Sequence, residues 1–202
     1  MMKNGLSVIV VCAVAMTGCS SDQPTASSNT ELFTHAGSNI PFPFEMEGFK
    51  RISIAEGEPD EAGVTVEYFF SQRGETVPME VTIYAHPDPP DPEEYAKDPK
   101  PNQEMQKARM DAVTAEILEA GKDREHRFIA YYDVVIVRDE KPFFAKRLFF
   151  RDKFDWFTNV YIVEYGKWLV EYRMVFPRNL ERNVDDFVLR HEWNTVTEDS
   201  ES

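Results

Sequence analysis

The side chains that could do chemistry in this chain are few, and their spacing fits no known catalytic frame. A zinc site needs several His or Cys ligands at set intervals, and a serine nucleophile needs a base, an orienting group and an oxyanion site. The sequence contains no H-E-x-x-H frame, no G-x-S-x-G elbow and no glycine-rich phosphate loop. We therefore predict no catalytic, metal-ligating or cofactor-binding residue. The side chains considered for these roles are His35, His86, His126, His191, Ser38, Ser53 and Ser71.

A run of carboxylates at 88–94, DPPDPEE, is the one cluster that invites a calcium ligand. Calcium takes six to eight oxygens, and an EF-hand loop supplies them at fixed spacing around a glycine. This run has neither that spacing nor the glycine. We interpret it as a solvated loop in which Asp91 can cap a short helix, with proline at the first helical position.

The reactive residue with the most informative surroundings is Cys19. It follows an apolar run of 11 residues at 6–16 and a start that contains one lysine, Lys3. A membrane-spanning helix needs about 20 apolar residues, so the run is typical of a removable secretory signal. The quartet Met16–Cys19 resembles the lipobox of bacterial lipoproteins. That resemblance implies cleavage between Gly18 and Cys19 and attachment of lipid, including palmitate, to the thiol of Cys19.

The lipobox resemblance also implies a cellular location. In enterobacterial lipoproteins an aspartate directly after the cysteine retains the protein at the inner membrane, and here Ser20 takes that place. We expect the chain to be anchored at the outer membrane, facing the periplasm. A plain secretory signal and an uncleaved anchor are the alternatives. The only other cysteine, Cys12, lies within the signal, so the mature chain is expected to contain no disulfide.

Composition predicts one domain on a tether. The formal charge of the chain is −14, which argues against nucleic acid as a partner because nucleic-acid binding relies on Lys and Arg. A chain of this length can bury one sizeable core. We divide it into a signal peptide at 1–18, a flexible polar tether at 19–38, a globular domain at 39–197 and a disordered acidic tail at 198–202.

Alternation of apolar and polar residues predicts strands in both halves of the domain. A helix at 103–120 separates the two sets, with Asn102 as its cap and Gly121 at its end. Asn179 can cap a final helix, whose apolar side holds Leu180, Val184, Phe187 and Val188. The core-facing stripe of the first helix is predicted to be Met110, Val113, Ile117 and Ala120. The predicted strands are 49–55, 64–70, 79–85, 126–138, 143–151, 156–165 and 167–176.

The connectors between the later strands are short and polar, so neighbouring strands are expected to pair as antiparallel hairpins. Parallel pairing needs crossovers of a dozen or more residues, and only the central helix supplies one. We therefore predict an α/β fold of the α+β type: a mainly antiparallel, twisted sheet of about six to seven strands with helices packed on it.

This order of elements is similar to that of the PsbP-like superfamily. The residues that carry the resemblance are the turn at 42–43 leading into Gly48-Phe49, the hairpin Glu164-Tyr165-Gly166, and 172–177, which closes the last strand. The superfamily includes a photosystem II extrinsic subunit, a nuclear-import factor and DcrB-type bacterial lipoproteins. It implies a fold without implying a catalytic centre.

Two aromatic features complete the expectations. The segment 142–157 contains six Phe and one Trp. We interpret it as a central strand covered on both faces, with an exposed partner-binding patch as the alternative. Trp168 is expected to face the core beneath the final helix, and Gly166 to adopt a positive φ in the preceding hairpin.

The function predicted from these observations is a lipid-anchored accessory or binding protein of the cell envelope, without catalytic activity and with an unknown protein partner. Two alternatives stay open. One is an immunity-type inhibitor of a secreted effector, where the acidity of the chain would complement a basic target. The other is an envelope enzyme whose site is assembled from dispersed residues, which a cleft with convergent His, Asp and Glu would favour.

Overall fold

The computed structural model describes residues 32–57, 63–72, 75–85, 91, 101–138 and 141–191. The predicted signal peptide, the lipidation site Cys19, His86, the acidic tail and all of the 88–94 run except Asp91 lie outside these residues. No helix within the described part is long and apolar enough to cross a membrane.

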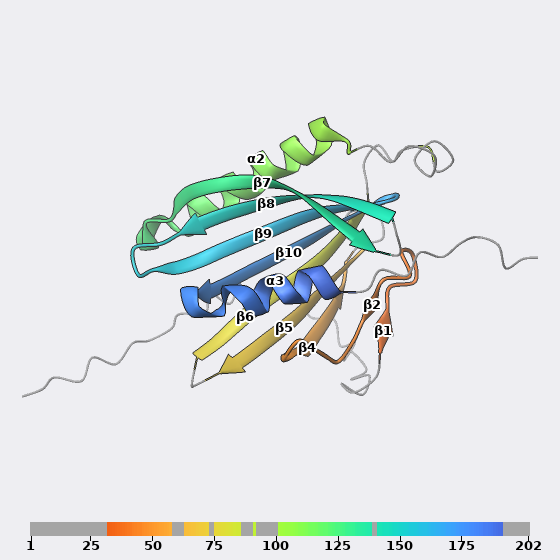
Figure 1. Ribbon diagram of the computed structural model, residues 1–202, viewed down its shortest axis with the longest axis horizontal. Coiled ribbons are helices and arrows are strands. Elements are labelled where there is room, and N and C mark those ends of the chain that lie inside the picture. Colours follow the sequence, from red (N-terminus) through yellow and green to blue (C-terminus); the bar gives the residue numbers. More distant parts are fainter. Residues whose placement is uncertain are drawn as a thin grey trace, which may run out of the picture.

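An eight-stranded antiparallel sheet forms the body of the domain, in the spatial order β3-β4-β5-β6-β10-β9-β8-β7 (Figure 1). A two-stranded ribbon, β1-β2, lies apart from it. The strands are β1 (Phe33–Thr34), β2 (Pro41–Phe42), β3 (Glu45–Met46), β4 (Phe49–Glu56), β5 (Val64–Gln72), β6 (Glu75–Ala85), β7 (Arg127–Arg138), β8 (Lys141–Arg151), β9 (Trp156–Tyr165) and β10 (Trp168–Pro177).

Two α-helices pack on opposite faces of this sheet (Figure 1): α2 (Gln103–Ala120) and α3 (Glu181–Arg190). Short 3-10 turns, η1 (Lys122–Arg124) and η2 (Arg178–Leu180), precede β7 and α3. The α+β class with a mainly antiparallel sheet is confirmed. The sheet contains one strand more than the upper number expected, because the two-residue β3 pairs with β4.

The bounds of α2 agree with the predicted helix at both ends because its signals are local. The Asn102 side chain accepts a hydrogen bond from the Met105 backbone N–H at 3.0 Å, which is the expected N-cap. The backbone N–H of Gly121 donates to Ile117 at the other end, at 2.8 Å. One member of the predicted stripe is wrong: Ala120 is exposed, since the helix ends there, beyond the part that contacts the sheet.

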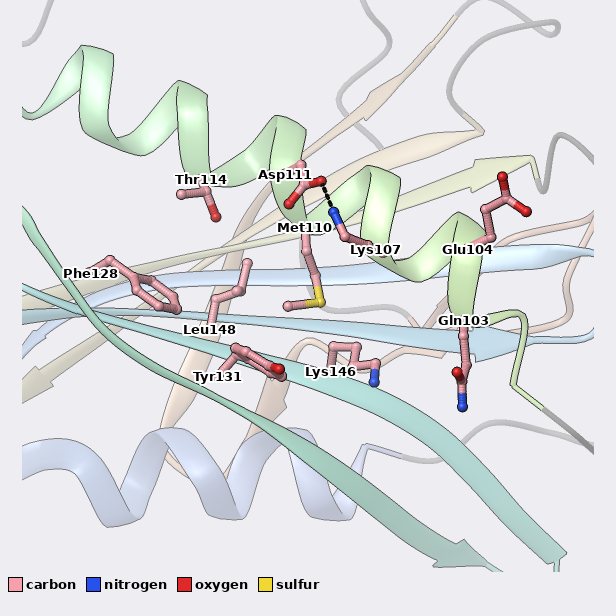
Figure 2. A pocket seen from close by; sticks show the side chains of 10 residues that line it. All are labelled: Gln103, Glu104, Lys107, Met110, Asp111, Thr114, Phe128, Tyr131, Lys146 and Leu148. Atoms are coloured by element: carbon pink, nitrogen blue, oxygen red, sulfur yellow. Dashed lines mark hydrogen bonds and ion pairs between the residues drawn. The ribbon is translucent and has the colours of Figure 1, made fainter.

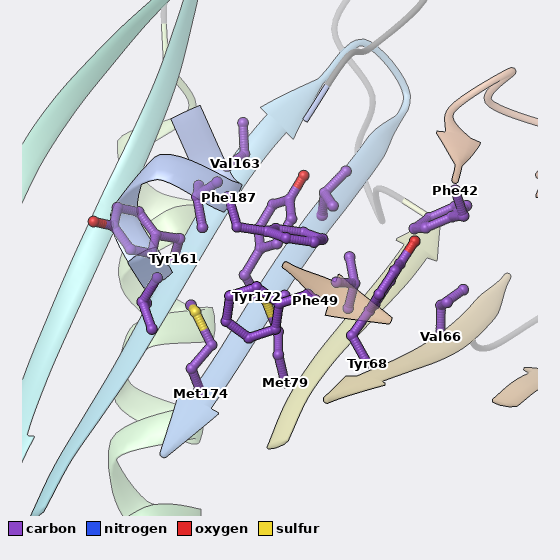
Figure 3. Packing of buried hydrophobic residues seen from close by; sticks show 14 of the residues in the cluster. Phe42, Phe49, Val66, Tyr68, Met79, Tyr161, Val163, Tyr172, Met174 and Phe187 are labelled. Atoms are coloured by element: carbon purple, nitrogen blue, oxygen red, sulfur yellow. The ribbon is translucent and has the colours of Figure 1, made fainter. Parts of the chain in front are cut away.

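The larger core lies between the sheet and α3. Phe187 of α3 is fully buried and its ring contacts Phe49 at 5.2 Å and Tyr68 at 5.1 Å between centroids (Figure 3). Tyr172 of β10 completes this aromatic group. The predicted apolar side of the final helix is therefore confirmed. Its predicted cap is wrong: Asn179 lies within η2, and α3 begins after Leu180 without a side-chain cap.

A smaller core lies on the opposite face, beneath α2. Val113 and Ile117 of the helix pack there against residues of β8, β9 and β10. Leu148 and Phe150 of β8 belong to this cluster, whereas Phe143 and Ala145 of the same strand belong to the α3 side. The aromatic strand is thus buried on both faces, as interpreted, although it lies second from the edge and not at the centre of the sheet.

The N-terminal boundary of the domain differs from the predicted one. Residues up to 38 were expected to belong to the tether, but Phe33 pairs with Phe42 in the β1-β2 ribbon and Ser38 is buried. The Ser38 hydroxyl accepts a hydrogen bond from the backbone N–H of Ile40. Because the turn closes on itself in this way, a segment that is polar in sequence becomes part of the fold.

Trp168 occupies a different environment from the one predicted. It is half-buried and packs at the margin of the larger core. Its indole N–H donates to the Gly37 carbonyl at 3.2 Å, and its ring lies edge-on to His35 at 5.0 Å. The N-terminal turn, and not α3, therefore covers Trp168. Gly166 has the expected positive φ of 55°.

Candidate functional site

A groove with a volume of about 680 Å³ runs between α2 and the β7–β8 pair (Figure 2). Its base is apolar, formed by Met110 beneath the helix and Leu148 on β8, and its sides carry the polar residues. Clefts of this size and character are typical of binding sites. The lining residues are Gln103, Glu104, Lys107, Met110, Asp111, Thr114, Phe128, Tyr131, Lys146 and Leu148.

The cations along this groove are engaged by neighbouring carboxylates. Lys107 Nζ pairs with Asp111 Oδ2 at 2.5 Å, on one face of α2 (Figure 2). Lys146 of β8 pairs with Asp133 of β7. A small anionic ligand would have to displace one of these pairs, so the apolar base is the more available part of the groove.

The far wall of the groove belongs to an unusual surface on β7. Six of its large apolar side chains are exposed, with 43–64% of each accessible. Single exposed apolar residues are ordinary, whereas several on one strand, which here lie on both of its faces, indicate an interaction site or an aggregation risk. We call this set the β7 surface: Phe128, Ile129, Tyr131, Tyr132, Val135 and Val137.

The position of β7 in the sheet explains this exposure. Within the described residues it is the outermost strand, paired with β8 on one side only. An edge strand presents unpaired backbone N–H and C=O groups, which natural proteins usually protect with charges, bulges or a covering element. β7 has a register shift between Phe128 and Ala130, and from Ala130 to Arg138 its pairing with β8 is regular.

The three histidines in the described part have different surroundings. His191 is fully buried, with Nδ1 at 2.7 Å from the Tyr172 hydroxyl and Nε2 at 2.6 Å from the Pro41 carbonyl. His126 lies near the carbonyl of Ile117. Among the residues described, no group of three or more His, Cys, Asp or Glu could hold a metal ion.

His35 and Ser38 form the only Ser–His contact that we identify among the described residues, with Nδ1 at 2.8 Å from the hydroxyl. The two residues are three apart in one turn, and the Ser38 backbone N–H also points at the same nitrogen, at 3.2 Å. Burial lowers the pKa of His35. Because Ser38 is itself buried, this contact stabilises a turn and does not expose a nucleophile.

Two carboxylic acids have raised pKa values, and they lie on opposite faces of the sheet. Burial raises the pKa of Glu164 in β9 to about 7, against the lowering effects of the Asn102 backbone N–H and of Lys146. The Asn102 N–H donates to both Glu164 oxygens, at 2.9 and 3.1 Å, at the start of α2. Burial also raises the pKa of Asp185 on α3, which accepts a hydrogen bond from Tyr161 at 2.8 Å.

These acids do not converge on a common cleft. Glu164 is closed off by the N-terminus of α2, and Asp185 is held between Tyr161 and Arg147, 3.3 Å from the latter. A third acid, Glu171, is buried beneath α2 between Arg109 and Arg173, at 2.7 and 2.9 Å. Each buried charge therefore has its own structural partner. The described residues form buried ion pairs and one apolar edge, without an acid–base constellation.

The β7 surface is the feature that sequence reasoning did not locate. The aromatic run drew attention to β8, whose side chains are covered, while the exposed residues lie on the preceding strand. The sequence RFIAYYDVVIVR at 127–138 is apolar at both odd and even positions, which is typical of a buried strand. Asp133, in the middle of the strand, is the one local sign of an edge.

The fold and this surface define the class: an α+β domain with an eight-stranded antiparallel sheet between two helices and exposed apolar side chains on an edge strand. No family model matches the chain, and no curated protein matches it. Among solved structures it is similar to the solution structure of cyanobacterial PsbP (CyanoP) from Synechocystis sp. PCC 6803, with 9% identity and a TM-score of 0.44. The match covers 82% of this chain and 91% of that one. A similarity of this degree carries no argument about function.

Proposed function

We propose that this chain is a non-catalytic accessory protein of the bacterial cell envelope, lipid-anchored through Cys19, that binds another protein through the β7 surface. The observation that carries the proposal is the set of six exposed apolar side chains on one edge strand. Leaving such a set in water invites association with other molecules. The buried acids each have a structural partner, which favours binding over catalysis.

Site-specific photo-crosslinking in intact cells tests the binding surface. A photoreactive residue replaces Tyr132 on β7, which is 51% exposed, and in a second strain it replaces Ile52 on β4, which is 48% exposed. The two positions differ in location and hardly in exposure. We expect a discrete crosslinked product from position 132 only. Equal products from both positions would contradict a specific β7 contact.

The anchor is tested separately. Replacement Cys19→Ala removes the thiol that the lipobox resemblance assigns to lipid, so labelled palmitate should no longer be incorporated and the protein should leave the membrane fraction. Replacement Cys12→Ala, within the same signal segment, is the matched control and should leave labelling intact. Wild-type protein that takes up no palmitate would end the lipoprotein hypothesis and leave the β7 proposal standing.

A further inference from the structure

We infer that the partner binds by strand addition: an extended, acidic segment of another protein pairs with the open edge of β7 and lengthens the sheet. This inference rests on the proposed function and specifies the binding mode and the chemistry of the partner. The regular part of the edge, Ala130–Arg138, is the stretch that can accept it, because the register shift lies just before it.

The backbone of β7 supplies the first requirement. In an antiparallel pair, alternate residues direct their N–H and C=O groups toward the neighbour, and the remaining residues direct theirs away. Within the described part only β8 pairs with β7, so half of the edge groups of this strand face outward. A partner strand would satisfy them with main-chain hydrogen bonds, which give affinity in this mode of recognition.

Side chains supply the second requirement. Tyr131, Val135 and Val137 are spaced at even intervals and so share the α2 face of the strand, where Tyr131 also lines the groove. They are 57%, 55% and 64% exposed. An added strand with apolar residues at alternate positions would place them beside this row, on the same face of the lengthened sheet.

Charge supplies the third requirement. The hairpin 127–151 contains six Lys or Arg and three Asp or Glu, a formal charge of +3 in a chain whose total is −14. The rest of the chain therefore carries −17. An acidic segment would be attracted to this hairpin and repelled by other parts of the surface, which fixes where it binds. A second copy pairing through the same edge would bring two +3 hairpins together.

A membrane surface fits these observations less well than a strand. Basic and aromatic residues together can bind anionic lipid, but hydrocarbon cannot satisfy the unpaired backbone groups of an open sheet edge. Burying Tyr131 or Val135 in acyl chains would bury those groups as well. A protein strand covers the apolar row and pairs the edge in the same step.

Binding of designed peptides to the full-length chain in nanodiscs of zwitterionic lipid tests the inference. The probe is a fluorescent peptide as long as Ala130–Arg138 that alternates Val with Glu, and the matched peptide alternates Val with Lys. We expect the Glu peptide to bind at least tenfold more tightly, measured by fluorescence anisotropy, with an affinity that falls as salt is added. Equal affinities would overturn the acidic-partner inference.

Backbone methylation of the Glu peptide then distinguishes strand addition from side-chain docking. N-methyl groups are placed on one alternating set of amides or on the other. Strand pairing predicts that one set abolishes binding and the other leaves it within about threefold, because only alternate amides face β7. Equal loss with both sets would overturn strand addition, even if position 132 crosslinks to a partner in cells.

Two protein variants locate the site. Val135→Glu, which replaces an apolar side chain of the exposed row with a charge of the same sign as the peptide, should weaken binding of the Glu peptide at least tenfold, and Ile52→Glu on β4 should leave it unchanged. Both side chains are exposed, so melting temperatures should stay within about two degrees of wild type. Equal weakening of peptide binding by both variants would overturn the inference. A doubled particle mass, which indicates pairing of two copies, would also overturn it, as would binding of the protein to anionic vesicles in competition with the peptide.

Discussion

Strands β7 and β10 are similar in length and in apolar content, yet they differ in how far their apolar side chains are buried. In β10, Val170, Tyr172, Met174 and Phe176 are all fully buried. In β7 only Ile136 is buried, and most of the other large apolar side chains are exposed. The difference lies in their neighbours: among the described residues, β10 is flanked by β6 and β9, and β7 by β8 alone.

The comparison teaches that apolar residues in a strand can serve two purposes. In β10 they stabilise the domain, because α3 and the flanking strands exclude water from them. In β7 they add little stability, since water still reaches them, and the proposed function assigns them to binding. Substitutions in the two strands should therefore have effects of very different size.

Replacement Tyr172→Ala in β10 should give the largest effect. It removes a fully buried ring from contact with Phe187 and His191, and we expect a loss of about 3–5 kcal/mol in the free energy of unfolding. Urea denaturation measures it. Tyr172→Phe, which keeps the ring and removes the hydroxyl that lies 2.7 Å from His191 Nδ1, should cost about 1 kcal/mol. A loss below 1 kcal/mol for Tyr172→Ala would mean that β10 is not the centre of the core.

Glu164→Gln tests the free-energy cost of burying a charged carboxylate in the interior strand β9. The folded-state pKa of about 7 lies above the ordinary 4.5, so the folded protein binds the proton more tightly than the unfolded chain does. The resulting stability is fully present below pH 4.5 and is lost as the pH rises through 7. The variant should therefore gain stability relative to wild type over this range, by about 2 kcal/mol, because solvent screening reduces the roughly 3.4 kcal/mol that the full pKa difference would give.

The control for that experiment is the edge-strand acid Asp133, whose side chain is 72% exposed. Urea denaturation of wild type, Glu164→Gln and Asp133→Asn at pH 5 and pH 8 gives the comparison. Only the Glu164 variant should show the relative gain. A constant difference between Glu164→Gln and wild type at the two pH values would show that the carboxylate of Glu164 is hydrated in the folded state.

Trp168→Ala compares the half-buried start of β10 with its fully buried centre. This residue begins the strand but is half-buried against the N-terminal turn, so its loss should cost about 2 kcal/mol, roughly half of a fully buried aromatic truncation. Thermal unfolding gives the value. A Gly37→Ala change acts on the same contact, because a Cβ at Gly37 would lie 2.6 Å from the Trp168 ring. If neither change lowers the melting temperature, the N-terminal turn does not pack against Trp168 in solution.

The smallest effect on stability is expected in β7. Val135→Thr keeps the β-branched shape and replaces an exposed methyl with a hydroxyl, so the free energy of unfolding should change by less than about 0.5 kcal/mol. Crosslinking from position 132 should nevertheless weaken. If Val135→Thr costs as much as Trp168→Ala, β7 is covered in solution and the comparison between the two strands fails.

The helices and strands could be predicted where the sequence signals act between residues close together in the chain. The helix at 103–120 and the strand at 156–165 match the structure at both ends, because capping and alternation act between residues close in sequence. Asn179 failed as a cap because it lies within η2, so that α3 begins two residues later, after Leu180. Polar composition suggested a tether as far as residue 38, but hydrogen bonds within the turn order its last part.

The sequence by itself determined the class of the fold and the buried face of the strands that alternate, such as β10, since alternation records which side of a strand avoids water. The tertiary structure decided which strand lies at the edge. That choice depends on the pairing of β6 with β10, between segments about 90 residues apart. This pairing places β10 at the centre, leaves β7 outermost and turns an ordinary apolar strand into the candidate binding surface.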